Sequence, residues 1–305
     1  MKNIANIREP KLSDFIMLLT LGGALGSSFL FTKIGVETIP PFTLVTARLT
    51  FAAIVLAIYM KITSSSIPKG VYIWKYFLLL GIFANIIPFV LITWSEIFID
   101  SGLASIFMAL IPMFTSVTAN FVTEDERLNT RKILGLAIGF SGILILFGSH
   151  VLDLGNASQI LPKLACLLAA FCYAFSRILT RKLYFVPPVT TSMGVLVCAS
   201  VISIPISLIV DKPWLITPSP SSIFAVLCLS LICTSFAYII LYRLIAEVGA
   251  TFMTTMNYLV PMFGILWGVI FLGESPKVSS IVATAVIFSG LAVMNSSKKV
   301  IVEKS

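Results

Sequence analysis

Gly102 to Leu146 read GLASIFMALIPMFTSVTANFVTEDERLNTRKILGLAIGFSGILIL, and a similar stretch follows near the C-terminus. The first copy has an apolar run with Pro112-Met113-Phe114, an acidic turn at Glu124-Asp125-Glu126, and a second apolar run with Phe140-Ser141-Gly142. The second copy has, in the same order, Pro261-Met262-Phe263, Glu274 and Phe288-Ser289-Gly290. The proline tripeptides stand 149 residues apart and the serine tripeptides 148.

A third pair of motifs has almost the same spacing. Pro40-Pro41 and Pro187-Pro188 stand 147 residues apart. Three ordered pairs at one nearly constant offset, about half of the 305 residues, predict an internal duplication. We expect the first repeat to span residues 1–155 and the second to span 156–305.

The composition indicates a membrane protein. Apolar residues make up 58% of the chain and charged residues 11%, whereas a soluble domain is roughly half apolar and a quarter charged. The net charge of +8 is spread over short loops without a basic stripe, which favours a membrane orientation signal over a nucleic-acid partner. The five cysteines lie in apolar runs, form no CxxC motif and have no histidine nearby, so we predict neither a metal site nor a disulfide. No nucleotide-binding motif and no nucleophile–base arrangement occurs, so we also predict no cofactor and no catalytic residue.

Ten apolar runs approach the 20 or so residues that a helix needs to cross a bilayer. They lie at about 14–32, 42–60, 76–95, 102–122, 132–149, 162–180, 191–210, 222–242, 250–272 and 278–295. The predicted fold class is therefore an all-α membrane protein with ten transmembrane helices and no soluble domain between them.

The distribution of basic residues predicts the orientation. With a cytoplasmic N-terminus, sixteen of the 21 lysines and arginines fall inside, four fall outside, and Arg48 lies within a span. Both termini are then cytoplasmic. Because each repeat holds five spans, the second repeat enters the membrane from the opposite face, and the two five-helix repeats are inverted. Such folds place a solute site near the midplane between the halves and work by alternating access.

The chain resembles the EamA-type transporters of the drug/metabolite transporter superfamily. The resemblance rests on an ordered set of motifs over nearly the whole chain: Leu25-Gly26-Ser27-Ser28-Phe29, Pro40-Pro41, Ala47-Arg48, Gly102-Leu103-Ala104-Ser105, Pro112, Ala237-Tyr238, Gly249-Ala250, Pro261 and Leu272-Gly273-Glu274. It implies ten helices, a bacterial inner-membrane location and transport of small metabolites, often amino acids and frequently outward. The acidic turn departs from a strict repeat, since Glu124-Asp125-Glu126 stands opposite Gly273-Glu274-Ser275.

Pro112 and Pro261 stand at matched positions in the fourth and ninth spans. Each removes a backbone donor and weakens a helical turn, which a membrane protein tolerates where a neighbour or a cavity satisfies the freed carbonyl. We predict a pair of hinges at these residues. A plain kink that improves packing is the alternative.

Polar and aromatic residues within the spans are the candidate substrate ligands. They are Arg48, Asn85, Asn257, Tyr258, Tyr173 and Tyr238. An ionisable group within a span is a functional candidate by default; the alternative for Arg48 is that its side chain extends to the outer interface. The asparagines require hydrogen-bond partners, and the alternative to a ligand role is that they join neighbouring helices. The resemblance implies that the sixth and eighth spans, with Tyr173 and Tyr238, line the cavity.

The acidic residues leave the coupling ion open. All thirteen lie in loops or near span ends, and Glu96 and Glu247 come closest to the membrane. A proton-coupled carrier often keeps a carboxylate deep within a span. Without one, facilitated exchange or coupling through a less obvious group remains.

The predicted function is secondary transport of small metabolites without covalent chemistry, as an exporter or exchanger of amino acids or related compounds. Alternatives are export of amphipathic drugs or nucleotide-like metabolites, an integral-membrane enzyme acting on lipids, and a channel or structural subunit. The expected partners are a small-molecule substrate and the lipid bilayer, and the chain is expected to act as a monomer or homodimer.

Overall fold

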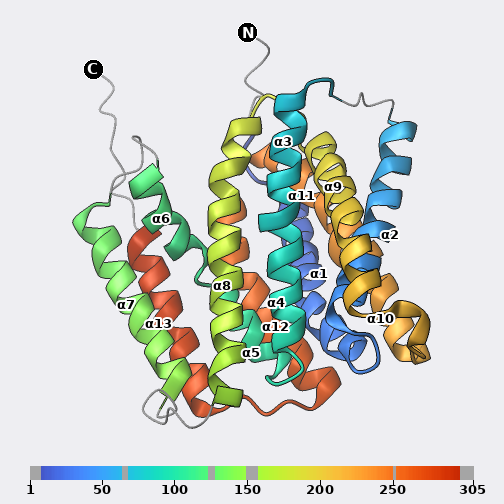
Figure 1. Ribbon diagram of the computed structural model, residues 1–305. Helices are drawn as coiled ribbons and strands as arrows, with labels where there is room; N and C mark the ends of the chain where they lie inside the picture. Colours follow the sequence, from blue (N-terminus) through green and yellow to red (C-terminus); the bar gives the residue numbers. More distant parts are fainter. Residues whose placement is uncertain (1–7, 64–67, 123–127, 149–156, 250–251, 296–305) are drawn as a thin grey trace, which may run out of the picture.

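The computed structural model describes residues 8–63, 68–122, 128–148, 157–249 and 252–295, and these ranges contain helices and no strand (Figure 1). The predicted repeat boundary at residues 155 and 156 and the acidic turn at 124–126 lie outside them. Within the described ranges, ten segments are long and apolar enough to cross a membrane, and they coincide with the ten predicted spans. The predicted fold class is confirmed.

The spans of the first repeat are α1 (Leu12–Val36), α2 (Pro41–Ile62), α3 (Val71–Leu80) with the π-helix η1 (Gly81–Ile86) and α4 (Ile87–Ser95), α5 (Ser101–Met108) with α6 (Ile111–Val122), and α7 (Thr130–Phe147). Those of the second are α8 (Ala157–Thr180), α9 (Pro188–Val210), α10 (Pro220–Ser230) with the π-helix η5 (Leu231–Phe236) and α11 (Ala237–Val248), the 3₁₀ segment η6 (Phe252–Thr255) with α12 (Met256–Leu272), and α13 (Val278–Asn295). Two 3₁₀ turns, η3 (Arg181–Leu183) and η4 (Pro213–Leu215), lie in connections of the second repeat.

The starts and ends of the spans follow local sequence rules. Pro41 and Pro188 are the first residues of α2 and α9, where a missing N–H costs nothing because it has no partner in the helix. The side chain of Asn129 caps α7 by accepting from the Lys132 amide at 2.9 Å. Gly273, with φ of 66°, ends α12 in the left-handed conformation that favours glycine.

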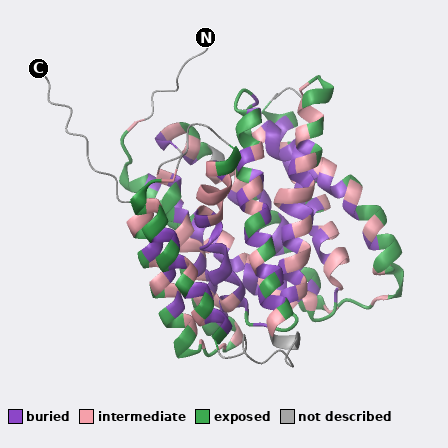
Figure 2. Ribbon diagram, turned by 60° about the vertical axis from the view of Figure 1, so that its left-hand side comes forward, coloured by how far each residue is buried: buried purple, intermediate pink, exposed green. Residues whose placement is uncertain are grey.

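Many large apolar side chains are exposed, as a surface against lipid requires. Figure 2 shows buried residues along the interior of the bundle and exposed ones on its outer faces and ends. Examples are Ile54 on α2, Val201 on α9, Phe224 on α10 and Ile270 on α12, each at least 50% exposed. An apolar surface of this extent is unfavourable in water and matches a hydrocarbon environment.

The contact between α7 and α13 demonstrates the inverted symmetry. A Cβ atom added to Gly135 would lie 2.5 Å from the Gly290 carbonyl oxygen, and one added to Gly142 would lie 3.1 Å from the Ala283 carbonyl oxygen. Moving each first-repeat residue forward by the 148-residue offset converts one contact into the other. The two helices are therefore antiparallel and exchange under a two-fold operation.

A second antiparallel pair, α2 and α9, lies toward the opposite edge of the bundle (Figure 1). The Thr43 and Ser207 hydroxyls are 3.0 Å apart, and the Thr46 hydroxyl donates to the Ser203 carbonyl at 3.1 Å. A first-repeat helix thus meets its own counterpart at both edges. This arrangement fits a pseudo-two-fold axis that runs in the membrane plane through both pairs.

The two π-helices are the feature of the fold that the sequence analysis did not predict. η1 and η5 begin 150 residues apart, at Gly81 and Leu231. In each, a side chain donates to the carbonyl five residues back: Asn85 to Leu80 at 3.4 Å and Ser235 to Ser230 at 2.9 Å. Turns of π-helix inside α-helices are rare and concentrate at functional sites. One such turn in each repeat makes the region around η1 and η5 a candidate functional site.

The matched prolines occupy different local structures. Pro112 is the second residue of α6, and the turn at Ala109 and Leu110 separates it from α5. Pro261 lies inside the continuous helix α12, and its carbonyl accepts from the Ser105 hydroxyl of α5 at 3.3 Å. The fourth span is therefore broken just before Pro112, whereas the helix of the ninth span continues through Pro261. Their role as hinges stays a prediction.

Candidate functional site

Arg48 is a buried charged residue at the seam between the repeats. It lies on α2, its side chain is buried, and only 7% of the residue is exposed. Its Nε donates to the Thr234 hydroxyl of η5 at 3.0 Å, and its guanidinium carbon lies 3.9 Å from the centroid of the Phe89 ring on α4. A guanidinium over an aromatic face is stabilised by the ring quadrupole, and this hydrogen bond uses one of its five N–H donors.

Two tyrosines complete the surroundings of this guanidinium. The Tyr173 ring packs edge-on against Phe89, with the ring centroids 6.4 Å apart. Tyr238 packs against the buried apolar cluster that contains Phe89. Both hydroxyls interact electrostatically with Arg48. We call Arg48, Phe89, Tyr173, Thr234 and Tyr238 the arginine cluster. It draws residues from both repeats and brings together three of the six predicted ligands.

Two contacts between the repeats occupy equivalent positions but differ in chemistry. Ser27 on α1 and Cys233 on η5 have Oγ and Sγ 3.4 Å apart. At the corresponding place, Phe175 on α8 and Phe83 on η1 have ring centroids 5.2 Å apart. Of these two equivalent contacts, one is therefore small and polar and the other is aromatic.

Asn85 lies one helical turn before Phe89 and is only 2% exposed. Its Nδ2 satisfies the Leu80 carbonyl of the π-helix, whereas its buried Oδ1 has no hydrogen-bond partner among the described residues. A buried acceptor without a donor is unfavourable, so this oxygen is a ready acceptor for a solute N–H. Its role as a ligand stays a prediction.

The other two predicted ligands do not join the arginine cluster. The Asn257 side-chain oxygen accepts from the Arg177 guanidinium of α8 at 3.4 Å. The Tyr258 ring packs edge-on against Phe288 of α13, with centroids 5.1 Å apart. They are neighbours in sequence, but the helix directs one toward α8 and the other toward α13.

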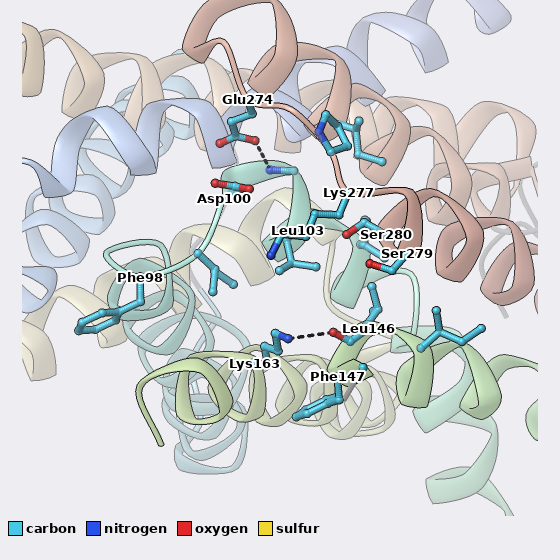
Figure 3. A pocket seen from close by; sticks show the side chains of 17 residues that line it. Phe98, Asp100, Leu103, Leu146, Phe147, Lys163, Glu274, Lys277, Ser279 and Ser280 are labelled. Atoms are coloured by element: carbon cyan, nitrogen blue, oxygen red, sulfur yellow. Dashed lines mark hydrogen bonds between the residues drawn. The ribbon is translucent and has the colours of Figure 1, made fainter. Parts of the chain in front are cut away.

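A cavity of about 490 Å³ lies at one end of the bundle, where parts of both repeats meet (Figure 3). Its walls come from the α4–α5 connection, α5, the end of α7, the first turns of α8 and the α12–α13 connection. By the distribution of basic residues this is the predicted outer end. We call it the mouth cavity.

The mouth cavity contains charges of both signs. Lys163, which is 7% exposed, and Lys277 point into it from opposite walls, and Asp100 and Glu274 lie at its far end (Figure 3). The Lys163 ammonium donates to the Leu146 carbonyl at 2.9 Å. Lys163 is one of the four basic residues that the sequence analysis placed outside, and it was not selected as a candidate ligand. The overlooked signal was its position directly after Pro162 at the start of the sixth apolar run, since ionisable residues within spans are functional candidates.

Glu274 has a structural task at the edge of this cavity. Its two carboxylate oxygens accept from the backbone amides of Ser101 at 2.7 Å and Gly102 at 3.0 Å, the first residues of α5. A carboxylate at a helix N-terminus satisfies free donors and interacts favourably with the helix dipole. Glu274 thereby fixes the connection after α12 to the start of a helix from the other repeat.

Replacing Glu274 by alanine is expected to destabilise the protein by about 0.5–2 kcal/mol, the usual cost of losing an N-terminal cap. Thermal unfolding in detergent measures the effect. Ser275→Ala, at the neighbouring exposed residue, is the matched control and should unfold as the wild type does. Equal midpoints for both variants would show that the carboxylate contributes nothing to the stability of α5.

The chain is similar to membrane transporters over nearly its whole length. The family model described as "EamA-like transporter family" matches twice, at residues 14–148 and 161–296. The uncharacterized transporter YoaV of Bacillus subtilis is 22% identical over 87% of this chain and 91% of its own length. The uncharacterized inner membrane transporter YedA of Escherichia coli K12 is 26% identical over 86% of each chain. A solved crystal structure with 17% identity superposes with a TM-score of 0.67 over 94% of this chain and 98% of its own, which shows a shared fold.

Proposed function

Because this chain belongs to the EamA-like transporter family and is a multi-pass membrane transporter, we propose that it exchanges or exports amino acids or related compounds by alternating access. The observation that carries the proposal is the arginine cluster at the seam of the two inverted repeats. Rocking of one repeat against the other would open this seam to each side of the membrane in turn.

The chemistry of the arginine cluster supports a substrate with a carboxylate. A guanidinium offers paired donors in the geometry of a carboxylate, and Arg48 supplies one in surroundings from which water is largely excluded. The rings of Phe89, Tyr173 and Tyr238 provide an apolar surface beside it. An α-amino acid with an apolar or aromatic side chain fits both features.

The mouth cavity supports the same substrate class. It offers the ammonium groups of Lys163 and Lys277 and the carboxylate of Asp100. A zwitterion complements such a pair of charges better than an anion or a cation alone. The cavity would act as the outer vestibule of the transport route.

The distribution of basic residues supports a location and an orientation for the protein. We propose the cytoplasmic membrane of a bacterium, with both termini in the cytoplasm, on the sixteen-to-four distribution of basic residues. YedA, one of the relatives, carries "inner membrane transporter" in its name. Cysteine labelling with an impermeant reagent at Ser13 and at Lys277, as Ser13→Cys and Lys277→Cys, should label only the second in intact cells.

Counterflow in proteoliposomes tests the substrate. Vesicles loaded with an unlabelled L-amino acid should accumulate the same labelled amino acid transiently and saturably, and vesicles without protein should not. A panel of apolar, aromatic, acidic and basic amino acids identifies the preferred side chain. Ethidium and uridine monophosphate represent the drug and nucleotide alternatives, and counterflow of either one without any amino acid would replace the proposal.

A further inference from the structure

Glu96 is a fully buried acid without a hydrogen-bond partner for its carboxyl group. It follows the last residue of α4, in the connection to α5, and is 0% exposed. Neither carboxyl oxygen has a hydrogen-bond partner within the described residues. Glu247, the other acid close to the membrane, contrasts with it: it pairs with Arg8 at 2.5 Å and with Arg243 at 2.8 Å.

The groups around Glu96 come from four other elements. Lys33 of α1 is the nearest cation, but its ammonium donates to the backbone carbonyls of Glu96 and Ile99, the latter at 2.8 Å. Arg48 of α2, Glu274 of the α12–α13 connection and the Cys166 thiol of α8 also interact with the carboxyl electrostatically. Asp100, in the same connection as Glu96, is exposed.

An ionised carboxylate in these surroundings is unfavourable. Burial removes its hydration, and no donor replaces the lost water. Burial raises the pKa of Glu96 well above its usual range, and Glu274 acts in the same direction, whereas Lys33 and Arg48 oppose the shift. The neutral, protonated acid is therefore the favoured form in this conformation.

We propose that Glu96 is the proton-binding site that couples transport to the proton gradient. The inference rests on the proposed function, because it assigns the driving ion of that transport. In the conformation described, the O–H bond is intact. When the α4–α5 connection opens to water, the bond breaks, the proton passes to water on that side, and the carboxylate that remains gains Lys33 as a partner. Each cycle then moves one proton.

The arrangement of Lys33 makes this change local. Its ammonium is already bound to the turn that carries Glu96, so it has to move only from the carbonyl oxygens to the carboxylate of the same residue. Arg48 of the arginine cluster, which is bonded to Thr234, also lowers the pKa of Glu96 through its charge. A solute carboxylate on Arg48 would neutralise that cation and so change the electrostatic environment of Glu96, which links solute binding to the proton site.

Infrared spectroscopy and unfolding test the proton site without any substrate. At neutral pH the wild type should show the carbonyl band of a buried carboxylic acid, and Glu96→Gln should lack it. Because the folded-state pKa is raised, the stability from Glu96 is present at low pH and lost as pH rises through that pKa. Wild type should therefore lose thermal stability with rising pH relative to Glu96→Gln. Glu37→Gln, at an exposed acid, should behave as the wild type in both measurements.

Transport then separates the coupling from the substrate. With equal pH on both sides, wild type and Glu96→Gln should both perform amino-acid counterflow. With a pH gradient, wild type should accumulate the amino acid and Glu96→Gln should not. Gradient-driven accumulation by the variant, or no infrared band in the wild type, would overturn the inference. Absence of counterflow by the wild type would overturn the proposed substrate class alone, and the infrared band would still decide the proton site.

Discussion

Replacing Arg48 by methionine should reduce amino-acid counterflow roughly tenfold to a hundredfold, because a hydrogen bond to a charged group contributes about 1.5–3 kcal/mol. Methionine keeps much of the length and apolar volume of the side chain but cannot donate to a carboxylate. The Phe89 ring and the Thr234 hydroxyl remain in place, and the latter still donates to the Leu229 carbonyl at 2.8 Å. The apparent affinity and the maximal rate of counterflow measure the effect.

The stability of the Arg48→Met variant distinguishes transport from structure. Replacing a buried charge by an apolar residue of similar volume is often neutral or stabilising, so the unfolding midpoint should not fall. Arg243→Met is the matched control: it removes an arginine whose exposed side chain pairs with Glu247, and transport should be unchanged. A variant that unfolds much earlier than the wild type, yet transports normally when folded, would assign Arg48 to packing alone.

A smaller change separates the charge from its orientation. Thr234→Val removes the hydroxyl that accepts from Arg48 but leaves the guanidinium and its contact with Phe89. We expect an effect on transport several times weaker than that of Arg48→Met, mostly in affinity. An equally large loss would mean that Thr234 itself contacts the solute.

The spans and the duplication could be predicted because they depend on local properties of the sequence. Ten apolar runs of bilayer length can be recognised in the sequence alone, without knowledge of any tertiary contact. The two π-helices could not be predicted in this way. Residues 81–86 and 231–236 share only an isoleucine at the second position, Ile82 and Ile232. Their equivalence lies in the backbone and in which side chain reaches the carbonyl five residues back.

The candidate ligands were predicted in part for a similar reason. Polarity within a span identified Arg48, Tyr173 and Tyr238, which the fold brings together. It also selected Asn257 and Tyr258, which point toward different helices. The helix face on which a residue lies depends on the packing partner, and an isolated polar residue does not report that partner.

Glu96 illustrates the opposite error. The sequence analysis placed it at a span end, as one of the two acids closest to the membrane, and did not include it among the candidate ligands. The connection between α4 and α5 instead lies against α1, where Lys33 donates to its carbonyls. Burial of an acid in a short connection is a tertiary property, and only the structure discloses it.

Gly290→Ala is expected to be among the most destabilising single-methyl substitutions in this chain. An added Cβ would lie 2.5 Å from the Gly135 carbonyl oxygen and 2.6 Å from the Gly139 amide nitrogen. Both are backbone atoms of α7 and cannot rotate away as the end of a side chain can. Overpacking of this kind costs about 1–3 kcal/mol, so the unfolding midpoint in detergent should fall clearly.

Gly23→Ala is the matched control for this substitution. Its added Cβ would meet only the side chains of Phe263 and Trp267, at 3.9 Å, which is ordinary van der Waals contact. Both variants gain the same helix propensity, so the difference between them reports the separation of the backbones. Because α7 and α13 exchange under the two-fold operation, Gly142→Ala should also destabilise the protein, but less, since its closest backbone atom lies at 3.1 Å. A Gly290 variant as stable as the Gly23 variant would mean that the two repeats do not meet at this helix pair.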